Sequence, residues 1–341
     1  MPLLSCVKTA GLRFLRHSGV FQLVRESSWR AHRLLILCYH GVSLDDEHQW
    51  RPSLYLAPGT FRSRMEVLKR QRANVLSLAD GIRRLYSGTL PPRSVAITFD
   101  DGFYDFYRQA HPVLRDFGFP AAVYWATEYS EYRVPVFNLI CSYLLWRGRG
   151  RVIPGKALEL ECALDLTGSP GIRAAENLIF ETVERRVLSL PERDCYARAL
   201  AGLLGIDYDA ILDSRTLQIM APAEVREAAA GGVDIQLHTH RHLTPRDEDT
   251  FRKEIRDNRR QITACTGLNP THFCYPSGVY HPEFPAWLRS ESVVSATVCD
   301  AGLAGDRSDP FKLPRVLDGQ QMNDIQIEAW VSGVGSWLPR R

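Results

Sequence analysis

The stretch Ser94–Gly102, SVAITFDDG, decides the fold of this 341-residue chain. It reads as a buried apolar strand that ends in two adjacent carboxylates, Asp100 and Asp101, before a glycine turn. Neighbouring residues on an extended chain point to opposite sides, so the two acids can take different tasks. Taken alone, two adjacent aspartates at the end of a strand more often form a turn that caps the next helix. A second segment must therefore support any chemical interpretation.

That second segment is Val233–His242, VDIQLHTHRH, in which an apolar strand delivers His238 and His242. One carboxylate and two imidazoles are typical of a catalytic divalent metal site that leaves a position for water. The remaining carboxylate is then free to act as a base. A solvated loop is the alternative, but histidines buried without a ligand would leave ring nitrogens to satisfy. Both motifs follow strands, at the end where α/β folds place their chemistry.

The rest of the chain alternates between short apolar runs and helical periodicity, which predicts a parallel sheet or barrel. A helical insertion is expected over 131–218, where amphipathic helices follow one another with no clear strand. The expected organisation is an N-terminal helix over 1–33, an α/β barrel over 34–320 that contains this insertion, and a C-terminal helix and tail over 321–341. The expected strands outside the insertion are 34–39, 73–76, 94–101, 121–127, 233–237, 271–276 and 295–299.

Composition narrows the class of partner. A net charge of +3, with no basic face interleaved with aromatics, implies no nucleic-acid partner. The eight cysteines are scattered without CxxC spacing, which favours reduced thiols in a cytosolic compartment.

The first 33 residues carry six Lys or Arg and one acid, Glu26. Because charges interrupt every apolar run, the segment predicts neither a secretory signal nor a membrane-spanning helix. It predicts one basic amphipathic helix, either packed on its own domain or resting on anionic lipid. The expected location is cytoplasmic, with possible peripheral contact at the inner membrane face.

With these residues in place, the chain resembles the polysaccharide deacetylase (NodB-homology) family of carbohydrate esterases over about 34–316. The matching motifs are LCYHGVS at 37–43, TFDDG at 98–102, HTHRH at 238–242, HFCYPSG at 272–278 and KLPRV at 312–316. The resemblance implies a distorted (β/α) barrel and hydrolysis of acetyl groups on sugars.

Roles carried over from the family imply Asp100 as the catalytic base and Asp101, His238 and His242 as metal ligands. Zinc is the default ion for these ligands, although Co²⁺, Ni²⁺ or Fe²⁺ would fit them. The backbone N–H of Tyr275 would bind the oxyanion.

Two departures from the family pattern matter. His272 stands where the third motif often has an arginine, so Arg315 is expected to orient Asp100. No histidine follows His281. The general acid therefore stays open between His281, His240 and a water on the metal.

The expected function is a metal-dependent hydrolase that removes acetyl groups from N-acetylated sugars of a polysaccharide or glycolipid precursor. The alternative is a catalytically silent glycan-binding or assembly protein with the same barrel. A zinc peptidase would need HExxH, and a deaminase HxE with PCxxC, and the sequence contains neither motif.

Overall fold

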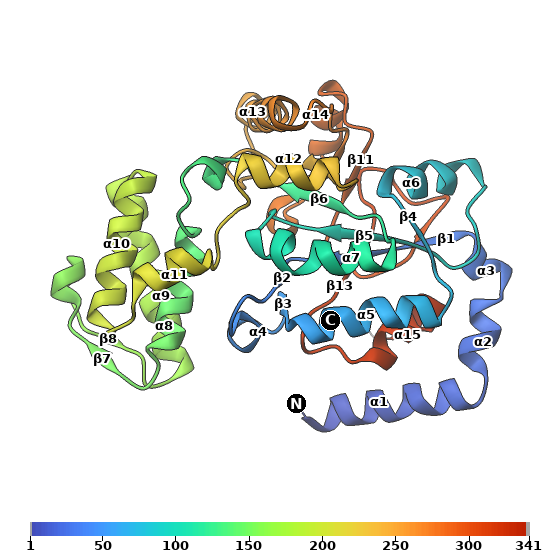
Figure 1. Cartoon of the computed structure of the whole chain (residues 1–341), viewed down its shortest axis with the longest axis horizontal. Coiled ribbons are helices and arrows are strands. Elements are labelled where there is room, and N and C mark those ends of the chain that lie inside the picture. Colours follow the sequence, from blue (N-terminus) through green and yellow to red (C-terminus); the bar gives the residue numbers. More distant parts are fainter. Residues whose placement is uncertain (1, 339–341) are drawn as a thin grey trace.

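The computed structural model describes residues 2–338, with side chains from Val7 onward. Its centre is a curled, mostly parallel sheet with the strand order β11-β10-β9-β6-β5-β1-β12 (Figure 1). In addition, β4 pairs with β5 and β13 pairs with β1. The strands are β1 (Arg33–Tyr39), β4 (Asn74–Leu76), β5 (Ser94–Phe99), β6 (Ala122–Trp125), β9 (Asp234–Leu237), β10 (His272–Cys274), β11 (Ser295–Thr297), β12 (Ala304–Gly305) and β13 (Val316–Leu317).

The parallel register brings the carboxyl ends of these strands to one edge. Tyr39 of β1 lies opposite Phe99 of β5, and Leu237 of β9 lies opposite Trp125 of β6. The residues that follow these strands therefore face a shared region. The sheet confirms the expected distorted (β/α) barrel, in the form of a curled half-barrel.

One late segment joins the two sides of the curl. Leu313 bridges to Thr297 of β11, and Val316 then pairs with Leu37 of β1. The backbone N–H of Val298 also donates to the carbonyl of Leu313 at 3.0 Å. Residues 313–317 thus link the first and last parallel strands.

Apolar side chains pack against both faces of the sheet, in two separate clusters, which explains why β1 and β5 are almost continuously apolar. The covering helices are α5 (Pro58–Arg70), α6 (Leu78–Ser87), α7 (His111–Phe117), α12 (Pro222–Ala230), α13 (Glu248–Thr266) and α14 (Phe284–Ser290). A π-helical turn at Phe106–Ala110 precedes α7. A small lobe follows β1, made of β2 (Gly41–Val42), α4 (Glu47–Trp50) and β3 (Tyr55–Leu56).

The stretch between β6 and α12 forms a helical unit with its own apolar core, beside the barrel in Figure 1. Its helices are α8 (Phe137–Arg147), α9 (Ser169–Arg186), α10 (Leu190–Leu203) and α11 (Tyr208–Ser214). The expectation that it lacks strands is wrong, because β7 (Val152–Ile153) and β8 (Leu164–Asp165) pair antiparallel. Two-residue strands are too short to produce an alternating pattern.

The single N-terminal helix expected from the sequence is also wrong. The segment forms α1 (Pro2–His17), α2 (Val20–Arg25) and α3 (Ser28–Ala31). Gly19, with φ of 82°, breaks the first two apart. They pack on α15 (Asp324–Ser332) and the following turn η5 (Val334–Trp337). Residues 339–341 of the expected tail lie outside the described chain. Within residues 2–338, none of the helices has the length and hydropathy that a membrane span requires.

Candidate active site

The turn after β5 sets the directions of the two carboxylates. Asp101 and Gly102 both adopt left-handed backbone conformations, with φ of 67° and 78°. A Cβ on Gly102 would lie 2.6 Å from Cδ1 of Trp125, so the turn needs glycine both for its conformation and for the close approach. This turn separates Asp100 and Asp101 into two distinct environments.

Asp101, His238 and His242 converge as the sequence predicted. Oδ1 of Asp101 lies 3.1 Å from Nε2 of His238 and 3.1 Å from Nε2 of His242. The three potential ligand atoms all lie within 4.8 Å of one another. Burial alone would raise the pKa of Asp101, but the two imidazoles hold it well below its usual range. The carboxylate is therefore ionised and can hold a divalent cation.

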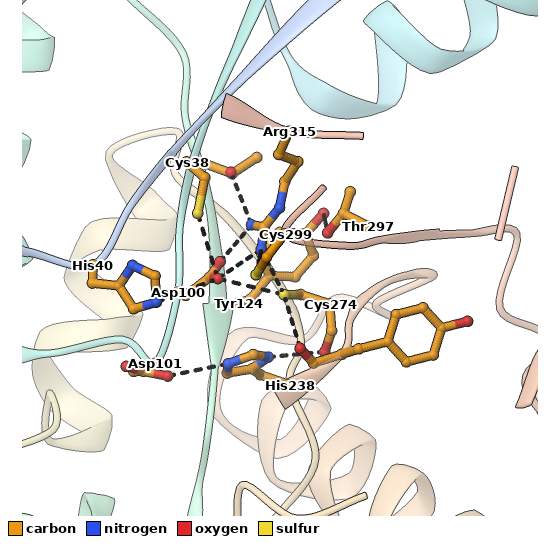
Figure 2. Close-up of polar contacts among 12 residues, drawn as sticks. Cys38, His40, Asp100, Asp101, Tyr124, His238, Cys274, Thr297, Cys299 and Arg315 are labelled. Atoms are coloured by element: carbon orange, nitrogen blue, oxygen red, sulfur yellow. Dashed lines mark hydrogen bonds and ion pairs between the residues drawn. The ribbon is translucent and has the colours of Figure 1, made fainter. Parts of the chain in front are cut away.

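The His238 ring is oriented by a contact behind it. Its Nδ1 lies 2.9 Å from the carbonyl oxygen of Cys274, and Nε2 points to Asp101 (Figure 2). An Nδ1–H that donates to this carbonyl leaves the Nε2 lone pair available, the arrangement usual for metal-ligating histidines. The backbone N–H of His238 donates to the Asn258 side chain at 2.9 Å. These contacts fit a metal ligand better than a solvated loop residue.

The loop after β9 folds back on itself, so that His242 lies beside His238. Thr239 and His242 both have positive φ, 61° and 57°. The Thr239 hydroxyl accepts from the N–H of Leu243 at 3.0 Å, which closes the turn. As a result the two imidazole rings lie 4.9 Å apart between centroids. Burial would lower the pKa of His242, but Asp101 raises it above its ordinary value.

Asp100 occupies a different environment and is clamped by Arg315. Nη1 and Nη2 of the guanidinium donate to its two oxygens at 2.6 and 2.7 Å, and both side chains are buried. Burial alone would raise the pKa of Asp100, but the guanidinium holds it well below its usual range. The structure thus brings together the two residues that the sequence paired, and Asp100 stays ionised.

His40 is a site residue that the sequence reasoning missed. Its Nε2 lies 3.8 Å from Oδ2 of Asp100, and Figure 2 shows its ring beside both Asp100 and Asp101. Its Nδ1 is buried and has no hydrogen-bond partner among the described residues. The available signal was its position directly after β1, at the same strand edge as Asp100.

Two buried thiols also face Asp100, although the sequence had indicated only that the cysteines are reduced. Sγ of Cys38 and Sγ of Cys274 each lie 3.5 Å from its Oδ2. Nη2 of Arg315 lies 3.0 Å from Sγ of Cys274. Burial raises the pKa of both thiols, so they remain protonated beside the carboxylate. The seven cysteines whose side chains are described are all free.

The other candidates lie around this centre. The N–H of Tyr275 is directed at the carbonyl of Thr297 at 3.4 Å, and its hydroxyl donates to the carbonyl of Phe311. A role for that N–H in binding an oxyanion stays a prediction. His272 is buried against the Ser295 hydroxyl at 2.8 Å.

The two histidines proposed as general acids have other neighbours. Nδ1 of His240 lies 2.8 Å from the Thr127 hydroxyl. The His281 ring packs edge-on against Phe284. Neither ring makes a hydrogen bond or ion pair to Asp100 or Asp101 in the described chain.

Sequence comparison agrees with this arrangement. The profile of the polysaccharide deacetylase family matches residues 87–149 and 182–291, just over half of the chain. Over 126 residues, the chain is 27% identical to the poly-beta-1,6-N-acetyl-D-glucosamine N-deacetylase of Escherichia coli K12. That match spans 36% of this chain and 18% of the relative.

Solved structures share the fold over most of the chain. The Streptococcus pyogenes deacetylase PplD, solved with acetate, aligns with a TM-score of 0.58 at 16% identity, over 90% of this chain and 99% of that one. IcaB from Ammonifex degensii aligns with a TM-score of 0.56 at 17% identity, over 88% of this chain and 97% of that one.

Proposed function

Because this chain belongs to the polysaccharide deacetylase family, we propose that it is a metal-dependent hydrolase that removes acetyl groups from N-acetylated sugars. The observation that carries the proposal is a division of labour between adjacent carboxylates. Asp101 converges with two imidazoles, while Asp100 is held apart by Arg315. A structural metal site would have no use for the second, separately held acid.

Asp101, His238 and His242 would hold the cation. A divalent ion bound there would lower the pKa of a water molecule and polarise the acetyl carbonyl. Two imidazoles and a carboxylate favour zinc, and Co²⁺, Ni²⁺ and Fe²⁺ accept the same ligands.

Asp100 would act as the general base. Its bidentate contact with Arg315 fixes the carboxylate plane and keeps it ionised at neutral pH, ready to accept a proton from the attacking water. The low pKa makes it a weak base, so the reaction depends on a water whose own pKa is lowered.

His40 is the best-placed general acid. It lies beside Asp100, with its Nε2 3.8 Å from Oδ2, and its buried Nδ1 has no hydrogen-bond partner among the described residues. A proton delivered from this ring to the departing sugar nitrogen would complete hydrolysis of the amide bond. A general acid at this position would take the place of the histidine that the sequence lacks after His281, and it supports an active hydrolase over a silent binding protein.

The substrate class rests on the curated relative. The E. coli enzyme is named for N-deacetylation of poly-beta-1,6-N-acetyl-D-glucosamine, which supports N-acetylglucosamine units as the target here. These units would belong to a polysaccharide or to a lipid-linked precursor in the cytoplasm, and assays on the two kinds of substrate separate these cases.

Acetate release tests the proposal. Purified protein is incubated with acetylated chitooligosaccharides and with O-acetylated sugars, before and after treatment with a chelator. We expect release from the N-acetyl substrates that stops after chelation and returns when Zn²⁺ is added. Release that is insensitive to chelation would refute metal dependence, and no release from the metal-loaded protein on either substrate would refute the activity.

A further inference from the structure

The N-terminal helices have one face fixed to the barrel. Leu12 and Phe21 are 1% and 7% exposed and pack with Ile325 and Ala329 of α15. Nε of Arg16 lies 3.0 Å from a carboxylate oxygen of Glu328. Figure 1 shows α1 running along the flank that α5 and α15 form. The apolar requirement of an amphipathic helix is thus already met by its inner face.

The outer face nevertheless carries large apolar side chains as well. Val7 and Phe14 are two helical turns apart on α1, opposite Leu12, and are 66% and 72% exposed. Leu23 of α2 is 73% exposed. Single exposed apolar side chains are common on protein surfaces. Here three exposed apolar side chains occur on α1 and α2, although Leu12 and Phe21 already anchor these helices to α15.

Nearby aromatic side chains extend this tendency. Trp29 of α3 is 37% exposed and Trp337 of η5 is 59% exposed. Trp337 precedes Leu338, which packs in the same small cluster as Leu12. Five of the thirteen large apolar side chains exposed in the described chain therefore come from α1 to α3 and η5.

The charge of this segment has a single sign. From residue 7 to residue 25 the charged side chains are Lys8, Arg13, Arg16 and Arg25, and none is acidic. The first acid, Glu26, lies 3.1 Å from Arg25 and 3.5 Å from Arg93. Lys8 and Arg13 make no ion pair among the described side chains.

We propose that α1 and α2 form a docking surface for membranes that contain anionic lipids. Phe14 and Leu23 would enter the boundary between headgroups and acyl chains, while Lys8 and Arg13 contact the phosphates. A helix with large apolar side chains and basic residues lies in the plane of the interface. Tryptophan favours the same depth. The basic charge of the segment is complementary to an anionic lipid surface. Charge alone would not favour exposed apolar side chains, whereas insertion into the lipid interface does.

Docking along this flank would hold the barrel beside the membrane. A substrate carried on a lipid would then be presented at a short range, which links the surface to the proposed function without depending on it. The docking side chains are presented by helices that are already folded, so binding requires little ordering.

Sedimentation with lipid vesicles tests the proposal on the full chain. Vesicles of phosphatidylcholine alone are compared with vesicles containing about one quarter phosphatidylglycerol, because each basic residue contributes through the anionic surface potential. We expect binding to the anionic vesicles that weakens at about 0.5 M salt, where charges are screened. The double variant Phe14→Ser, Leu23→Ser should bind at least about tenfold more weakly, since two apolar side chains leave the lipid. The variant Arg13→Glu should weaken binding about fivefold or more.

A matched control uses an exposed leucine elsewhere. Leu268, which is 54% exposed in the turn after α13, is changed to Ser and should leave binding unchanged. All variants should keep the wild-type melting temperature and the wild-type oligomeric state. Failure of the wild type to bind anionic vesicles would overturn the proposal, as would equal binding by the double variant. A dimer in lipid-free solution that the double variant dissociates would instead assign this face to a second copy. The vesicle readout does not require activity, so failure here is distinct from failure of the deacetylase proposal.

Discussion

Arg315 lies 215 positions after Asp100 in the sequence and donates two hydrogen bonds to its carboxylate, from Nη1 to Oδ1 and from Nη2 to Oδ2. Arg315 lies in the segment that links β11 to β1, and its Nε also donates to the carbonyl of Val298 at 3.2 Å. The segment that links β11 to β1 through its backbone therefore also supplies the side chain that keeps the proposed base ionised.

The first prediction concerns this pair. Arg315→Ala should lower the free energy of unfolding by about 3–5 kcal/mol, because it leaves a buried carboxylate without its partner. Arg315→Lys should retain much of this stability and still lose activity, because an ammonium cannot make the planar two-point contact. Chemical denaturation and acetate release measure the two effects. Equal activity of Arg315→Lys and wild type would show that carboxylate orientation does not matter.

The second prediction identifies the general acid. His40→Gln should keep the bound metal and lose about 10²- to 10⁴-fold in turnover, the usual contribution of acid–base catalysis. His240→Gln and His281→Gln serve as matched controls and should retain most of the activity, because their rings contact Thr127 and Phe284. A large loss in either control, with His40→Gln active, would transfer the role.

The third prediction is a pH dependence of metal binding. Asp101 raises the pKa of His242, so the cation must displace a proton that this ring holds more tightly than usual. Below that raised pKa, apparent affinity should fall about tenfold for each pH unit and each proton displaced. Calorimetric titration with Zn²⁺ from pH 8 down to about pH 6 should show this loss.

In the metal-free protein, the raised pKa of His242 makes the folded state less stable, not more stable, as the pH rises. A raised histidine pKa contributes stability that is fully present below the unfolded value of about 6.5 and is lost as pH rises through the folded value. The gain in melting temperature on adding Zn²⁺ should therefore be larger at pH 8 than at pH 6. A gain in melting temperature that does not depend on pH would show that metal binding does not displace a proton from His242.

The fourth prediction concerns the helical insertion. Asp46, in the lobe that follows His40, accepts from the Tyr143 hydroxyl of α8 at 2.5 Å, and Trp50 packs on the same ring. Replacing residues 137–217 with a short linker should retain the metal and change substrate preference. The Pro135–Gln218 bridge lies outside this cut. Tyr143→Phe should change the KM with little effect on metal content. Loss of folding in the linker variant would show that the unit is part of the core.

Much of the site is predictable from the sequence because it follows strand ends. Asp100, Asp101 and His238 each come directly after an apolar run, and parallel strands finish at one edge. His40 satisfies the same rule, yet its role depends on β1 lying next to β5, a pairing that no local pattern contains. The thiols of Cys38 and Cys274 were hidden for the same reason, since Cys38 lies on β1 beside β5, and Cys274 lies on β10, beyond β9 and β6 in the strand order.

Elements without a strong local signal were the ones predicted wrongly. Strands β7 and β8 are two residues each, and their pairing depends on the fold of the insertion. The break at Gly19 is a single left-handed residue inside a sequence whose periodicity continues through it. The direction of the N-terminal apolar side chains was equally inaccessible, because it depends on where α15 packs.

The most direct test of the central claim measures metal content and acetate release on the same preparations of wild type, Asp100→Asn, Asp101→Asn and His238→Ala. We predict one divalent ion per chain in the wild type and in Asp100→Asn, with turnover in Asp100→Asn reduced about 10²- to 10⁴-fold. Asp101→Asn and His238→Ala should lose both the ion and the activity. Equal metal content in His238→Ala and wild type, or near-normal turnover in Asp100→Asn, would contradict the division of labour between the two carboxylates.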